Sequence, residues 1–117
     1  MSPDTLMNLL RNWLKYECHV DPYGHIFPSK TAIDIAHFYF IESTKFTKTI
    51  EDAKMDRQGG ILVSFQKGGE KNKYILHIMM DGTIDYYTKS SGGKSTKQRL
   101  SFNDGNKKGF GTDKYHF

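Results

Sequence analysis

The fold is decided by the stretch GGILVSFQKGGEKNKYILHIMMDGTIDYYT at residues 59–88. Apolar residues alternate with more polar ones from Ile61 to Phe65, which is the period of a strand with one buried face. Asp81-Gly82 is a strong hairpin signal between two further apolar runs. The pattern predicts an antiparallel meander with turns at 59–60 and 68–69 and strands at 61–66, 74–79 and 83–88.

The register of the central hairpin follows from burial. A three-residue turn that ends at a left-handed Gly82 gathers four large apolar side chains onto one face, whereas a two-residue turn divides them between both faces. Burial of apolar surface therefore favours the three-residue turn. This register pairs Ile78 with Ile84 and Leu76 with Tyr86.

Two helices are expected before the meander. Ser2 and the following proline form a helix start, and leucines recur at helical spacing behind them, which predicts a helix over 3–17. Turn residues fill 19–28 and indicate a loop. Ser29 is a second N-cap, and the apolar stripe behind it predicts a helix over 30–43.

Helices followed by strands are typical of an α+β fold. We therefore expect two N-terminal helices packed on an antiparallel meander of three to four strands, the fourth at 98–102. A chain of 117 residues has the usual length of one domain, so we expect a single domain over 1–117. Since no signal peptide or membrane span is recognisable and the chain has one cysteine, we expect a soluble, cytoplasmic protein.

A series of turn and core residues occurs between positions 20 and 87: Tyr23-Gly24, Pro28-Ser29, Ala32-Ile33, Ala36, Gly59-Gly60-Ile61, Val63-Ser64-Phe65, Leu76, Ile78, Asp81-Gly82, Ile84 and Tyr86. On these residues the chain resembles a widespread family of small bacterial proteins of unassigned function. Phe65 stands where that family has a tryptophan. The resemblance implies an α+β fold with the sheet last, and it implies no catalytic residue.

Positive charge gathers in the last quarter of the chain. The basic C-terminal segment, residues 88–117, holds seven bases and two acids, a balance of +5, whereas residues 1–87 hold ten bases and eleven acids, a balance of −1. Such asymmetry indicates either an acidic partner or a solvated segment that only keeps the protein soluble. The candidate binding residues are the bases and rings of this segment: Lys89, Lys94, Lys97, Arg99, Lys107, Lys108, Phe102 and Phe110.

Two other groups of residues have the chemistry of a site. The predicted register sets His77 opposite Asp85, which makes the two residues candidates for general acid–base catalysis. Polar cross-strand pairs are commonly structural, however. The second group, around Cys18, matches no metal-ligand spacing, so we expect no metal and no cofactor.

The sequence thus favours a non-enzymatic binding module. We interpret the chain as a small bacterial or phage accessory protein, similar to an antitoxin, an immunity protein or an inhibitor, that docks on an acidic protein through its basic segment. Binding of DNA or RNA through the same segment is the first alternative, because lysines interleaved with aromatic rings suit phosphates and bases. A small hydrolase or nuclease built around His77 and Asp85 is the second. The sequence predicts no oligomeric state.

Overall fold

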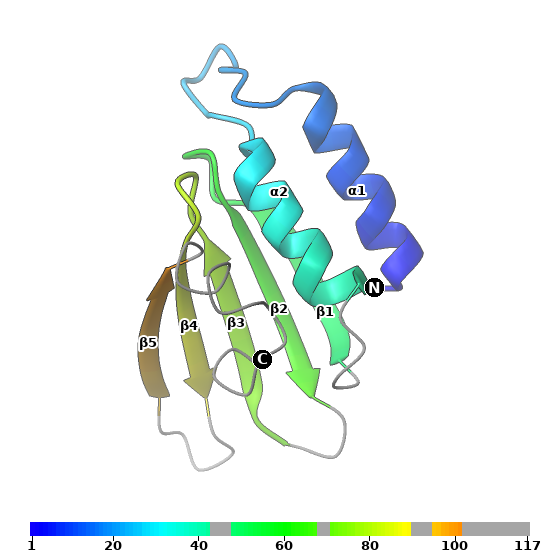
Figure 1. The fold of residues 1–117 in the computed structure, drawn as a ribbon, viewed down its shortest axis with the longest axis vertical. Coiled ribbons are helices and arrows are strands. Elements are labelled where there is room, and N and C mark those ends of the chain that lie inside the picture. Colours follow the sequence, from blue (N-terminus) through cyan, green and yellow to red (C-terminus); the bar gives the residue numbers. More distant parts are fainter. Residues whose placement is uncertain (43–47, 68–70, 90–94, 102–117) are drawn as a thin grey trace.

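The structure is a computed structural model that describes residues 1–42, 48–67, 71–89 and 95–101. Two helices open the chain and five antiparallel strands follow, each strand pairing with the next one along the sequence. Both helices lie on the same face of the sheet (Figure 1). The predicted α+β fold is therefore confirmed in class. The elements are α1 (Pro3–Lys15), α2 (Lys30–His37), the π-helical turn η1 (Phe38–Glu42), β1 (Lys48–Met55), β2 (Ile61–Lys67), β3 (Lys73–Ile78), β4 (Thr83–Lys89) and β5 (Ser95–Ser101).

Both helices begin at a serine whose side chain caps the first turn. The Ser2 hydroxyl accepts a hydrogen bond from the backbone N–H of Thr5 at 3.1 Å, and the Ser29 hydroxyl accepts one from Ala32 at 3.1 Å. Ser29 also donates to the carbonyl of Met80 at 2.8 Å, so this cap joins α2 to the β3–β4 turn. Each cap satisfies a backbone donor that has no partner within its helix.

The helices end earlier than the sequence pattern predicts. The first one stops at Lys15, and Cys18 adopts a φ of 55°, a left-handed conformation that a helix cannot contain. The second α-helix stops at His37 and passes into the π-helical turn rather than continuing to residue 43. Within this turn Tyr39 and Phe40 are both buried, so the aromatic run still serves the core.

The prediction of three to four strands is wrong, because the sheet has five. Strand β1 was missed because a bulge between Ile50 and Asp52 breaks its alternation and brings Ile50 and Ala53 to the same buried face. Strand β5 begins at Ser95, three residues before the predicted start, since its backbone pairs with β4 from Lys89 onward. Residue 102 and the predicted turn at 68–69 lie outside the described residues.

The predicted register of the central hairpin is confirmed. Ile78 pairs with Ile84 and Leu76 with Tyr86, and Gly82 has a φ of 93°. All of these apolar side chains except that of Tyr86 are fully buried, and Tyr86 is half-buried. Burial of these apolar side chains therefore favours the three-residue turn, as their alternation in the sequence predicts.

An aromatic row runs through the core from the helices toward the fourth strand. Phe40 meets Phe65 edge-on with ring centroids 5.1 Å apart. Phe65 stacks on Tyr74 at 5.4 Å, and Tyr74 stacks on Tyr86 at 5.6 Å. Such ring pairs add to the stabilisation that area burial alone provides. The row joins the helical layer to β2, β3 and β4.

The other face of the sheet, which we call the outer face, is turned away from the helices (Figure 1). The alternation along the strands and the register of their pairing show which side chains lie on it. On β3, β4 and β5 these are Lys73, Ile75, His77, Thr83, Asp85, Tyr87, Lys89, Ser95, Lys97 and Arg99.

Candidate binding surface

Three of the predicted basic residues share the outer face. Lys89 ends β4, and Lys97 and Arg99 alternate along β5, the strand at one edge of the sheet. The other five predicted binding residues lie outside the described residues: Lys94, Lys107, Lys108, Phe102 and Phe110.

Arg99 is partly neutralised by an acid of the same chain. Its Nε donates to Asp85 Oδ1 at 2.7 Å and its second guanidinium nitrogen donates to Asp85 Oδ2 at 3.1 Å, a two-point contact between neighbouring strands. The Asp85 side chain is 3% exposed. Hydrogen bonds from Arg99, together with the charges of Arg99 and Lys97, hold the pKa of Asp85 below its ordinary value in spite of burial. Arg99, one base of the basic segment, therefore stabilises the ionised carboxylate of the buried Asp85.

Lys97 is less completely neutralised by Asp85 than Arg99 is. Its ammonium group lies 3.8 Å from Asp85 Oδ2 and 5.7 Å from the centre of the Tyr87 ring. The side chain is 53% exposed. Because Asp85 already has the closer Arg99, its single negative charge does not neutralise both bases. The Asp85, Lys97 and Arg99 group thus carries a net positive charge of one.

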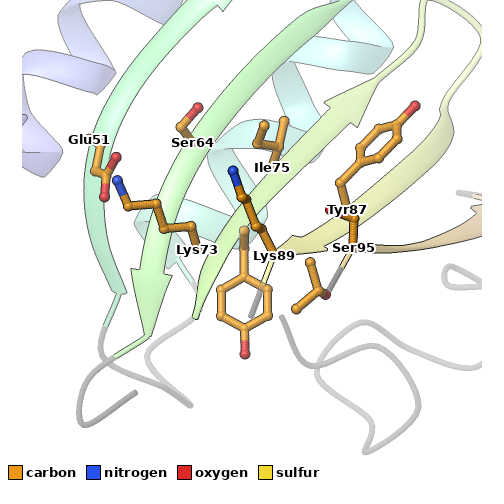
Figure 2. A pocket seen from close by; sticks show the side chains of 9 residues that line it. Glu51, Ser64, Lys73, Ile75, Tyr87, Lys89 and Ser95 are labelled. Carbon is orange, nitrogen blue, oxygen red and sulfur yellow. The ribbon is translucent and has the colours of Figure 1, made fainter. Parts of the chain in front are cut away.

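A cavity of about 290 Å³ adjoins this group on the outer face. Ile75 and Tyr87 supply apolar surface, and Lys73 and Lys89 stand beside them (Figure 2). The same cavity is lined by Glu51, Ser64, Tyr74, Thr88 and Ser95. The cavity thus has an apolar centre with two cations beside it.

The predicted pair of His77 and Asp85 is correct in backbone register, but their side chains bind other groups. His77 Nε2 lies 2.8 Å from Oδ2 of Asp56, in the turn between β1 and β2. Asp85 instead accepts a hydrogen bond from Arg99. A histidine and a carboxylate that are each bound elsewhere do not form the acid–base pair that the register alone indicates.

Asp56 is the polar residue that the sequence analysis missed. Its Oδ1 accepts the backbone N–H groups of Gln58 and Gly60, both at 2.7 Å. Burial works to raise the pKa of Asp56, but hydrogen bonds from His77 and from these two amides lower it below its ordinary value. An aspartate whose side chain accepts the N–H of the residue two positions later forms an Asx turn, which the local sequence can indicate. The contact of Asp56 with His77 joins residues that are 21 positions apart, so no local pattern indicates it.

The residues around Cys18 do not converge on one point. Asp21 Oδ2 lies 3.2 Å from His25 Nδ1, and Cys18 is exposed. The part of the chain that the structure describes contains no group of three or more histidine, cysteine, aspartate or glutamate residues arranged to hold a metal ion. Asp21 instead orders its own loop, because its Oδ1 accepts the N–H groups of Tyr23 and His25.

No family model matches the chain, and neither a curated protein nor a solved structure is significantly similar to it. Among the described residues, no helix is long and apolar enough to cross a membrane. The resemblance noted from the sequence therefore remains a prediction.

Arg99→Gln is expected to destabilise the protein in a pH-dependent way. An acid whose folded pKa is depressed stabilises the fold above its unfolded pKa of about 4, and this contribution disappears as the pH falls through the lower folded value. The variant should therefore unfold more easily than the wild type at pH 7, and the difference should shrink below about pH 4. Thermal unfolding followed by circular dichroism across this range measures the effect. A difference of equal size at pH 7 and pH 2 would contradict the role given to Asp85.

Proposed function

We propose that the protein is a non-enzymatic binding module that docks on an acidic protein through the outer face of β3, β4 and β5. The observation that carries the proposal is that Ile75 and Tyr87 line one cavity with Lys73 and Lys89, while the Lys97 ammonium group lies 5.7 Å from the centre of the Tyr87 ring. Ile75 is 39% exposed although it lies in a central strand of the sheet. An apolar centre supplies binding free energy and a charged rim supplies orientation and association rate.

The same surface favours a protein over a nucleic acid. Sequence-tolerant binding of single strands uses several aromatic rings on which successive bases stack. On the outer face of the described strands, Tyr87 is the one phenylalanine, tyrosine or tryptophan side chain. The exposed acids Glu51 and Asp52 occupy the β1 side of the sheet and would repel a phosphate backbone that crossed it. Both features suit a compact partner with a localised acidic patch.

The proposal is tested by capture from the native host with charge-reversed variants. Lys89→Glu/Lys97→Glu changes the outer face, and Arg11→Glu/Lys15→Glu makes the same change in net charge on α1. Wild-type protein and the α1 variant should retain one dominant acidic protein after nuclease treatment. The outer-face variant should bind that protein at least about tenfold more weakly in a titration with the purified partner, since two attractive rim charges become repulsive.

Three outcomes of this experiment contradict docking on an acidic protein. Equal capture by both variants would show that the outer face is not the binding surface. Loss of the captured material on nuclease treatment, with a steep salt dependence, would assign the surface to nucleic acid. A wild-type protein that retains nothing at physiological salt would remove the proposal.

A further inference from the structure

The cavity on the outer face brings together two lysines of like charge. Lys73 and Lys89 are direct cross-strand partners, and both side chains stand on the outer face (Figure 2). Like charges directly opposite each other destabilise a sheet. Neither ammonium group has an ion pair with any residue that the structure describes. Glu51 in the same cavity offsets part of this repulsion, and the positive charge that remains on the lysine pair is the feature that indicates an anionic ligand.

The cavity also holds an acid that limits the charge of such a ligand. Glu51, which enters from β1, lines the same cavity, and the Lys73 side chain points toward its carboxylate (Figure 2). The three groups together carry a net charge of +1. A single carboxylate would neutralise this charge, whereas a phosphate carrying nearly two negative charges would leave the site with a net negative charge.

The remaining wall and the volume set the size and character of the ligand. Ile75 and Tyr87 offer an aliphatic and an aromatic surface next to the two ammonium groups. A volume of about 290 Å³ lies at the small end for ligand pockets, which commonly measure about 300–1,000 Å³. The space thus suits one or two side chains better than a cofactor.

We infer that this cavity receives an acidic side chain of the partner protein together with an adjacent apolar side chain. The carboxylate lies between Lys73 and Lys89, and the apolar group packs on Ile75 and Tyr87. This inference rests on the proposed docking function and specifies the anchor of the complex. It assigns recognition to Lys73, which lies outside the basic segment, as well as to Lys89 within it.

The test uses a small probe, so it does not require the partner. 3-Phenylpropionate carries one carboxylate and one ring, and 3-phenylpropionamide is its neutral match. Titration of the ¹⁵N-labelled protein should give amide shifts confined to the cavity, with a dissociation constant on the order of millimolar for the acid. 3-Phenylpropionamide should bind at least about tenfold more weakly, because it lacks the negative charge that the lysines attract.

Variants separate this site from a general effect of net charge. Lys73→Gln/Lys89→Gln should weaken binding of the acid at least about tenfold, while Lys15→Gln/Lys54→Gln, with the same change in net charge, should leave it nearly unchanged. Lys54 is an exposed residue of β1 outside this cavity. Glu51→Gln should tighten binding, a gain that structural damage would not produce.

Each contrary result overturns the inference. Equal binding of acid and amide would leave an apolar pocket without anion recognition. If inorganic phosphate binds in the cavity more tightly than 3-phenylpropionate, the ligand of the site is a phosphate and not a single carboxylate. Unchanged binding by Lys73→Gln/Lys89→Gln would place the probe elsewhere.

The probe and the capture experiment can fail separately. Probe binding at the cavity without capture of an acidic protein would remove docking and leave a site for a free carboxylic acid, which also overturns the partner side chain as the ligand. Capture that depends on the outer face without probe binding would keep docking and overturn the anchor.

Discussion

Phe65→Ala is expected to lower the free energy of unfolding by about 3–5 kcal/mol, the cost of removing a large aromatic side chain from a packed core. The Phe65 side chain is fully buried and lies between Phe40 and Tyr74 in the aromatic row. Its removal leaves a cavity and also takes away both ring contacts. Because small domains are stable by about 5–15 kcal/mol in total, the variant should lose a large part of its stability.

Chemical denaturation measures this effect, with circular dichroism for the sheet and the fluorescence of Trp13 for α1. The midpoints of both unfolding transitions should shift together, since the aromatic row joins the helical layer to the sheet. Tyr23→Ala is the matched control, because the Tyr23 side chain is 85% exposed, and its effect should stay within about 0.5 kcal/mol. A loss below about 1 kcal/mol for Phe65→Ala would contradict the packing described for the core.

Asp56→Ala is expected to lower the free energy of unfolding by about 2–3 kcal/mol. The substitution removes the acceptor of two backbone N–H groups, at Gln58 and Gly60, and the partner of His77. Gly60 is buried, so its amide would lose its partner where water has little access. Hydrogen bonds to a charged acceptor contribute more than neutral ones, which is why the expected loss exceeds that of one ordinary hydrogen bond.

The damage from Asp56→Ala should spread to the neighbouring loop. The turn that Asp56 orders also binds Ile26, whose N–H donates to the carbonyl of Arg57 at 3.0 Å and whose carbonyl accepts the N–H of Gly59 at 3.1 Å. Hydrogen exchange of the Ile26 and Gly59 amides should therefore accelerate in the variant.

Asp52→Ala, which replaces an exposed acid of the preceding strand β1, makes the same charge change and should have little effect. The difference between Asp56→Ala and wild type should shrink as the pH falls below about 4, since the pKa of Asp56 is lowered by folding and its stabilisation is lost through that range. Unchanged hydrogen exchange at Ile26 would refute the role of Asp56 as the link between turn and loop.

Local patterns were sufficient where neighbouring residues decide the structure. The central hairpin could be predicted in register because alternation and the left-handed Gly82 act within a few residues of each other. The two serine caps could be predicted for the same reason. Strand β1 could not, since its bulge removes the alternation that identifies a strand.

Candidate site residues followed the same division. The sequence located the basic residues Lys89, Lys97 and Arg99 on the last part of the chain, and the structure shows that they share one face with Ile75 and Tyr87. No local pattern indicated that Lys73 and Lys89 would line one cavity with Glu51. Strand pairing alone created that neighbourhood.

By itself, the sequence determined the order of helices and sheet, the starts of both helices and the register of the central hairpin, because caps, turns and alternation are set by residues close together in the chain. Tertiary structure alone decided which charges meet. His77 binds Asp56 rather than the aspartate opposite it, and that aspartate holds Arg99 from the next strand. These pairings depend on how separate turns and strands come together, and a buried carboxylate is stable only where such a partner arrives.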